Sequence, residues 1–116
     1  MEMSPEEFDA IVDQALDEIP EEIAARVRNV VVLVEEEPPE EEPDDLLGLY
    51  DGVALTERDS GLIPQLPDRI FIFRGPLLDM CDDEQDLIKE IGITVVHEVA
   101  HHFGIDDERL HQLGYA

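Results

Sequence analysis

The stretch that decides the fold is Thr94-Val-Val-His97-Glu98-Val-Ala-His101-His102-Phe-Gly104-Ile-Asp106-Asp107. If it is helical, His97 and His101 are four residues apart and lie on one face, one turn above the other. Neutral imidazole is a favoured zinc ligand, so two rings placed in this way can bind one ion. Glu98 would then lie beside the open position of the ion, where a carboxylate can take a proton from bound water. We therefore expect a zinc-binding helix in which Glu98 is the catalytic base.

The residues after the second histidine suggest a third ligand. Gly104 is the expected end of the helix, because glycine readily adopts the left-handed conformation that turns a chain back. This turn would bring Asp107 to the metal, although a shift of one residue would bring Asp106 or Glu108 instead. Two histidines, a carboxylate and a water make a tetrahedral catalytic zinc site. His102 lies about 100° round the helix from His101, so we expect a supporting role for it.

The pattern His97-Glu98-x-x-His101-x-x-Gly104-x-x-Asp107 resembles the extended motif of zincin metallopeptidases, in the variant whose third ligand is Asp. The run His-Glu-Val-Ala-His-His-Phe-Gly-Ile-Asp-Asp-Glu is similar to a family of very small bacterial zincin-like proteins, the minimal zincins. The resemblance extends over most of the chain and implies a short zincin-like fold, a bound Zn²⁺ and peptidase activity. Metzincins also carry a Met-containing turn beyond the motif, and no Met follows Asp107 in this sequence.

The charge balance limits the possible partners. The chain has 31 acidic against 7 basic residues and a net charge of -24. Such a surface repels phosphate backbones and anionic lipids, so we expect neither nucleic-acid nor membrane binding. Metal hydrolases that act on RNA also use a His-x-x-x-His helix, but they need basic surface. A peptide or protein substrate, basic substrates among them, fits the charge; the sequence does not indicate the oligomeric state.

Length and cysteine content point to one domain in the cytoplasm. The 116 residues allow a single domain with a modest core. Cys81 is the only cysteine, which excludes an internal disulfide. The acidic N-terminus lacks the features of a signal peptide, and no apolar run approaches the roughly 20 residues that span a bilayer. We expect a single domain over residues 1–116 and a cytoplasmic location.

The order of the predicted elements indicates an α+β fold. Ser4-Pro5-Glu6-Glu7 is a helix start with a capping box, and apolar residues then recur at helical spacing from Phe8 to Ile19. Residues 29–34 and 69–73 read as strands, the first of them buried on both faces. A second helix is expected from about Asp83 to Phe103. We predict an N-terminal helix packed on a small mixed sheet, followed by the zinc-binding helix.

Two further sets of residues are candidates for the site. In zincin-like folds a strand before the active helix borders the cleft and pairs with extended substrate, and the candidate strand is Arg69, Ile70, Phe71, Ile72 and Phe73. Hydrolysis also needs a donor for the tetrahedral oxyanion, and His111 and Tyr115 are candidates by position alone.

Residues 35–45 form a low-complexity acidic loop, Glu-Glu-Glu-Pro-Pro-Glu-Glu-Glu-Pro-Asp-Asp. Its like charges repel and its prolines prevent strand pairing, so we expect an extended, mobile segment. Either it is only a solvated loop, or one of its carboxylates caps the zinc, or it attracts basic substrate segments.

The function that these observations favour is a zinc-dependent metallopeptidase of the HExxH type, which cleaves peptide bonds with a zinc-bound water and Glu98. The alternative is a catalytically weak or inactive protein of the same fold, with structural zinc and a basic protein partner. Glu98 separates the two, because only the peptidase requires it.

Overall fold

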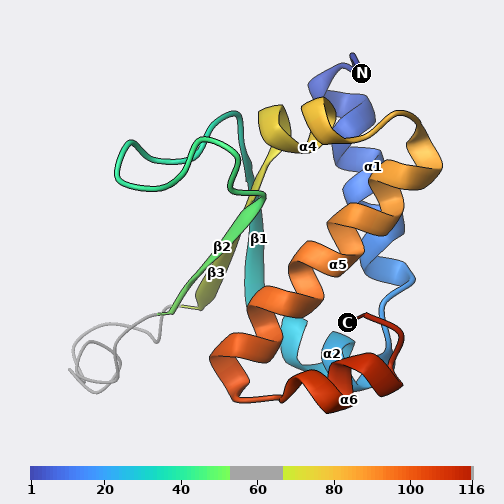
Figure 1. The fold of residues 1–116 in the computed structure, drawn as a ribbon, viewed down its shortest axis with the longest axis vertical. Helices are drawn as coiled ribbons and strands as arrows, with labels where there is room; N and C mark the ends of the chain where they lie inside the picture. The colour runs from blue at the N-terminus through green and yellow to red at the C-terminus, as the bar shows by residue number, and fades with distance from the viewer. Residues whose placement is uncertain (53–66, 116) are drawn as a thin grey trace.

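The computed structural model describes residues 1–52 and 67–115. The helices described are α1 (Pro5–Asp17), α2 (Glu21–Val27), α4 (Arg74–Met80), α5 (Glu84–Phe103) and α6 (Asp107–Gln112), and the strands are β1 (Val30–Glu35), β2 (Gly48–Asp51) and β3 (Asp68–Phe73). Helix α5 runs diagonally between the sheet and α1 (Figure 1). The predicted α+β fold with a small mixed sheet is confirmed, and α1 packs chiefly on α5.

The long helices begin and end where the sequence predicts. The Ser4 hydroxyl accepts a hydrogen bond from the Glu7 amide at 3.2 Å and caps α1. The Asp83 side chain caps α5 by accepting from the Asp86 amide at 2.8 Å. Helix α5 ends at Gly104, whose φ of 71° is left-handed. These ends follow from local capping chemistry, which satisfies backbone groups that a helix terminus leaves unpaired.

The sheet has the strand order β1-β3-β2. Strand β3 is parallel to β1, with Val32 opposite Ile70, and antiparallel to β2, with Tyr50 opposite Ile70. The prediction that residues 69–73 form a substrate edge strand is therefore wrong, because β3 is hydrogen-bonded on both sides. The sequence pattern predicts that β3 is a strand. It does not show which strands lie beside it, because β1 and β2 are distant from β3 in the sequence.

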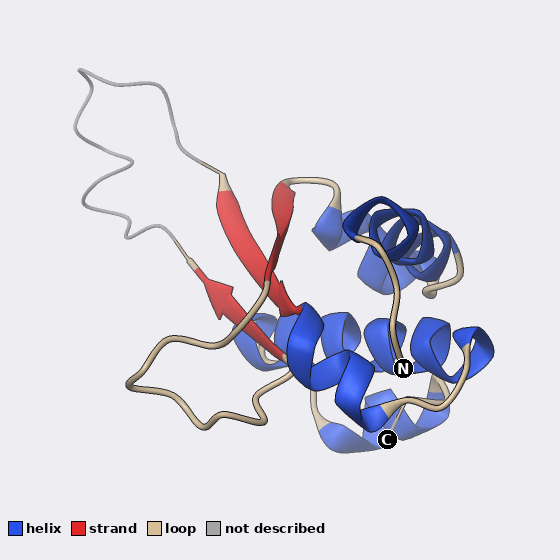
Figure 2. Ribbon diagram, turned by 90° about the horizontal axis from the view of Figure 1, so that it is seen from above, coloured by secondary structure: helices blue, strands red, loops and turns tan. Residues whose placement is uncertain are grey.

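Strand β1 also differs from the prediction, because one of its faces is open. Its residues alternate between half-buried and exposed, and Val31 and Leu33 remain 39% and 36% exposed. Within residues 1–52 and 67–115, most of the helices lie on one side of the strands and cover that face of the sheet (Figure 2). A run of β-branched residues here marks a strand at the sheet edge rather than one buried on both faces.

The core lies between the covered face of the sheet, α1 and α5. Its largest fully buried side chains include Phe8, Phe73, Ile23, Ile70, Ile72, Leu77, Leu87, Ile91 and Leu110. Val95, Val96 and Val99 of α5 are also fully buried, so the zinc-motif helix is fixed by packing on several sides. Among the helices of the described ranges, none is both long and apolar enough to cross a membrane.

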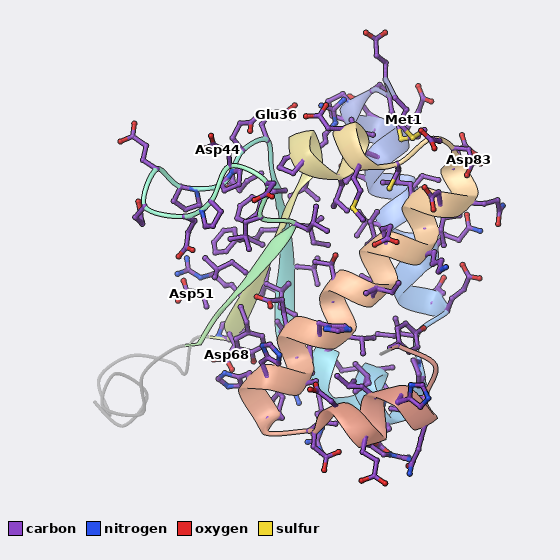
Figure 3. The ribbon with its side chains drawn as sticks, viewed as in Figure 1. Met1, Glu36, Asp44, Asp51, Asp68 and Asp83 are labelled. Carbon is purple, nitrogen blue, oxygen red and sulfur yellow. The ribbon has the colours of Figure 1, made fainter. Side chains whose placement is uncertain are left out.

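The acidic loop is attached to the fold at both ends (Figure 3 labels Glu36 and Asp44). Glu36 forms an ion pair with Arg74 at 2.7 Å, and its carbonyl accepts from the Gly75 amide at 2.9 Å. Just beyond the other end, the Phe73 amide donates to the Leu47 carbonyl at 3.0 Å and joins the segment to β3. Glu35 ends β1, residues 36–45 form no strand, as the prolines imply, and the mobility of the loop stays a prediction.

Because Cys81 is buried, the free energy of unfolding is expected to fall at alkaline pH. The side chain is 2% exposed, and burial, with a smaller contribution from Asp86, raises the pKa of its thiol to about 11, from 9.0. A pKa raised in the folded state favours folding below pH 9 and loses that contribution as pH rises through 11. We expect the free energy of unfolding to fall by roughly 2–3 kcal/mol over this range, measured by urea titration. Cys81→Ala should lack this component; an equal fall in the variant would contradict the assignment.

Candidate active site

Helix α5 places the two motif histidines on one face. The ring centroids of His97 and His101 are 6.5 Å apart and the ring planes are inclined by 62°. His97 is half-buried, whereas His101 is exposed. The predicted i, i+4 arrangement is therefore present, since both residues lie within the continuous helix.

His97 is hydrogen-bonded to the backbone of the C-terminal segment. Its Nε2 atom lies 2.6 Å from the carbonyl oxygen of Tyr115. A carbonyl oxygen can only accept, so this nitrogen must carry the proton. A metal needs the lone pair of a deprotonated nitrogen. Binding of an ion at this nitrogen therefore requires the contact with Tyr115 to open.

The carboxylate of Glu98 is held by the edge strand β2. Its Oε1 atom accepts a hydrogen bond from the Tyr50 amide at 3.1 Å. Strand β2 approaches α5 closely at Gly48, where an added Cβ would lie 2.5 Å from Thr94 Cγ2. The small residue thus lets the strand edge reach the helix, and this approach fixes the position of Glu98.

A pocket of about 380 Å³ opens beside Glu98. Its lining comes from the segment before β2 and from one face of α5: Pro43, Asp45, Leu46, Leu47, Gly48, Ile93, Thr94, His97 and Glu98. Three larger hollows, of about 850, 720 and 420 Å³, have neither His97 nor Glu98 among their described lining residues. The pocket of about 380 Å³ is the relevant one because His97 and Glu98 of the motif line it.

The structure favours Asp107 over Asp106 as the available carboxylate. Asp106 is the N-cap of α6 and accepts from the Arg109 amide at 2.8 Å. The Arg109 guanidinium also donates to both carboxylate oxygens of Glu22 on α2, at 3.1 and 2.5 Å, and this contact lowers the pKa of Glu22. Helix α6 is therefore anchored to α2, with Asp107 exposed in its first turn.

The donor set suits zinc, although it is not gathered into a site. Two imidazoles and a carboxylate, from His97, His101 and Asp107, are ligand types of catalytic zinc. Within residues 1–52 and 67–115, no three His, Cys, Asp or Glu side chains are close enough together to hold an ion. In this arrangement the Nε2 of His97 contacts the Tyr115 carbonyl instead.

A second group of residues, joined to Glu98 through Tyr50, was not predicted from the sequence. The Tyr50 hydroxyl donates to Asp68 at 2.6 Å, and the Tyr50 ring stacks on His102 with centroids 4.0 Å apart. The Nε2 atom of His102 lies 3.6 Å from the same carboxylate oxygen, and Figure 3 labels Asp68 at the start of β3. His102 thus supports the strand that holds Glu98. In the sequence, only its position next to His101 indicated a supporting role.

Neither predicted oxyanion donor lines the Glu98 pocket. His111 is exposed on α6. The Tyr115 ring lies against Gly92 of α5, and burial, with a contribution from Glu18, raises the pKa of its phenol. Only the backbone carbonyl of Tyr115 reaches the motif, and it has no proton to donate. The role of these two residues as donors stays a prediction that their placement does not support.

A long helix bearing His-Glu-x-x-His beside a small mixed sheet, with a carboxylate in the turn that follows, is the arrangement of the zincin class of metallopeptidases. The model of the zincin-like metallopeptidase family matches residues 27–115, and the chain belongs to this family. Its fold is similar to that of a conserved hypothetical protein from Thermo thermophilus, with 24% identity, a TM-score of 0.59, and coverage of 87% of this chain and 94% of that one. No curated protein sequence matches the chain.

Replacing Gly48 tests the close approach of β2 to α5. In Gly48→Ala the new methyl group would meet Thr94 Cγ2 at 2.5 Å and the Phe71 carbonyl oxygen at 3.0 Å. We expect a loss of about 1–3 kcal/mol in the free energy of unfolding, measured with urea. The matched control is Gly92→Ala on α5, where the nearest atoms are 3.9 Å away; it should be neutral or slightly stabilising. Equal stability of the two variants would contradict the contact.

Proposed function

We propose that this chain is a zinc-dependent peptidase with Glu98 as its proton carrier. Family membership supports a peptidase in general terms. The observation that carries the proposal is the position of Glu98, whose carboxylate lies in a pocket between the edge strand β2 and the helix face that bears His97. A carboxylate in this place can exchange protons with a peptide bound along the strand.

The residues divide the chemistry between them. His97, His101 and Asp107 would hold Zn²⁺, which supplies Lewis acidity that polarises the scissile carbonyl and acidifies water. Glu98 would take a proton from the attacking water and deliver it to the leaving amine. The Tyr50 amide holds the Glu98 carboxylate in one orientation, so the proton acceptor is placed before the substrate binds.

We assign to strand β2 the substrate-binding role that the sequence suggested for β3. It lies at one edge of the sheet, and Gly48 lines the pocket beside Glu98. An extended peptide can add to such an edge through main-chain hydrogen bonds, which do not depend on sequence. The Tyr50 amide is the exception, because it already donates to Glu98. We propose that a peptide or protein substrate lies along β2; the cytoplasmic location expected from the sequence stays a prediction.

Paired substitutions test the third metal ligand. Asp107→Asn should weaken zinc binding by more than about 100-fold, since loss of an outer-shell partner alone typically costs roughly 10- to 100-fold. Competition with a chromogenic chelator measures the affinity. The matched control is Asp106→Asn, which keeps a side-chain acceptor for the Arg109 amide and should retain zinc. Loss of zinc only in the Asp106 variant would reassign the ligand.

Glu98→Gln tests catalysis separately from folding. The amide oxygen of glutamine can still accept from the Tyr50 amide, but the side chain no longer takes up a proton. With zinc bound one to one in both proteins, the variant should cleave a mixed peptide library at least about 100-fold more slowly. Equal cleavage by the two proteins would rule out the proposed role of Glu98.

The alternative is an inactive zincin fold that binds a basic protein partner. One observation favours it: the Tyr115 carbonyl occupies His97 Nε2, one of the nitrogens that a catalytic metal would need. In that case the zinc-loaded chain would cleave no peptide, and Glu98→Gln would leave partner binding unchanged.

A further inference from the structure

The pocket beside Glu98 has an apolar wall with one carboxylate on its rim. Pro43, Leu46 and Leu47 come from the end of the acidic loop, and Ile93 faces them from α5. Asp45, which is exposed, lies between these apolar residues in the chain. The wall and the acid therefore come from one short segment directly before the edge strand.

The charges of the pocket are of one sign. Its carboxylates are Asp45 and Glu98, and no Lys or Arg is among its described lining residues. Arg74, the arginine beside the loop, is paired with Glu36 at the other end of the segment. The net charge of -24 adds a long-range field of the same sign. A cation in this pocket would thus meet attraction at both short and long range.

The rim is anchored close to Glu98. The Leu46 amide donates to the Pro43 carbonyl at 3.2 Å, which closes a turn around Asp45. The Phe73 amide donates to the Leu47 carbonyl at 3.0 Å, so the segment continues directly into the sheet. Gly48 then packs against Thr94 of α5. These contacts hold Asp45 at a defined place beside the pocket instead of at the tip of the loop.

We propose that this pocket selects a lysine or arginine side chain next to the scissile bond, and that Asp45 is the residue that determines this specificity. The long methylene stem of such a side chain can lie on Leu46, Leu47 and Ile93 while its charged end reaches a carboxylate at the rim. A neutral side chain would gain only the apolar contact, and an acidic one would be repelled. This inference rests on the proposed peptidase function and adds its substrate class.

The experiment compares peptides that differ only in charge. Each pair carries arginine or citrulline at one position, because citrulline keeps the shape and length of arginine without its charge. The zinc-loaded chain should show a higher kcat/KM for the arginine peptide, and Asp45→Asn should lower this preference by roughly three- to tenfold. Added salt should weaken the preference of the unaltered chain.

The matched control is Asp44→Asn. Asp44 is the adjacent acidic residue. It is exposed, as Asp45 is, but it does not line the pocket. This variant removes the same charge from the loop, so it should keep the preference for arginine. Equal losses in the two variants would show that the general field selects the substrate, and would overturn the role of Asp45.

A binding measurement separates this inference from the peptidase proposal. Fluorescence anisotropy gives the affinity of zinc-loaded Glu98→Gln for labelled arginine and citrulline peptides, with and without Asp45→Asn. Cleavage without a charge preference overturns the specificity and leaves the peptidase intact. Absence of cleavage, with arginine-selective binding that Asp45→Asn abolishes, overturns the peptidase and supports the pocket.

Discussion

The site depends on the close approach of strand β2 to helix α5. A glycine at position 48 lets the strand edge lie against Thr94, and two residues later the Tyr50 amide donates to Glu98. The same approach makes the segment before β2 one wall of the pocket and α5 the other. Since α5 is held by buried valines on several sides, the strand meets a fixed partner. A shift of β2 by one residue would point different amides at the helix.

Two residues of the motif, His97 and Glu98, form hydrogen bonds with backbone groups, and the two bonds have opposite consequences for catalysis. Glu98 accepts from one strand amide, and His97 Nε2 donates to the Tyr115 carbonyl. The first contact orients a proton carrier and is compatible with catalysis. The second competes with a metal, because one nitrogen cannot both donate a proton and bind an ion. Binding of an ion at this nitrogen would therefore require the segment that follows α6 to move.

Much of the fold could be predicted from the sequence because its signals are local. The cap at Ser4, the start of α5 near Asp83 and its end at Gly104 depend only on neighbouring residues. Strand order could not be predicted, because β3 pairs with β1 and β2 through contacts distant in sequence. For the same reason the stack of Tyr50 on His102 and the position of Asp45 were not visible. The sequence also did not show that Asp106 is engaged as the cap of α6, whereas Asp107 as the third ligand stays a prediction.

The most direct test of the account is a crystal structure of zinc-loaded Glu98→Gln with an uncleaved peptide. We expect zinc to be bound by His97, His101 and Asp107, with the Tyr115 carbonyl released from His97. The peptide should lie alongside β2 with its scissile carbonyl beside residue 98. Zinc bound by other residues, or a peptide seated on another face of the protein, would contradict it.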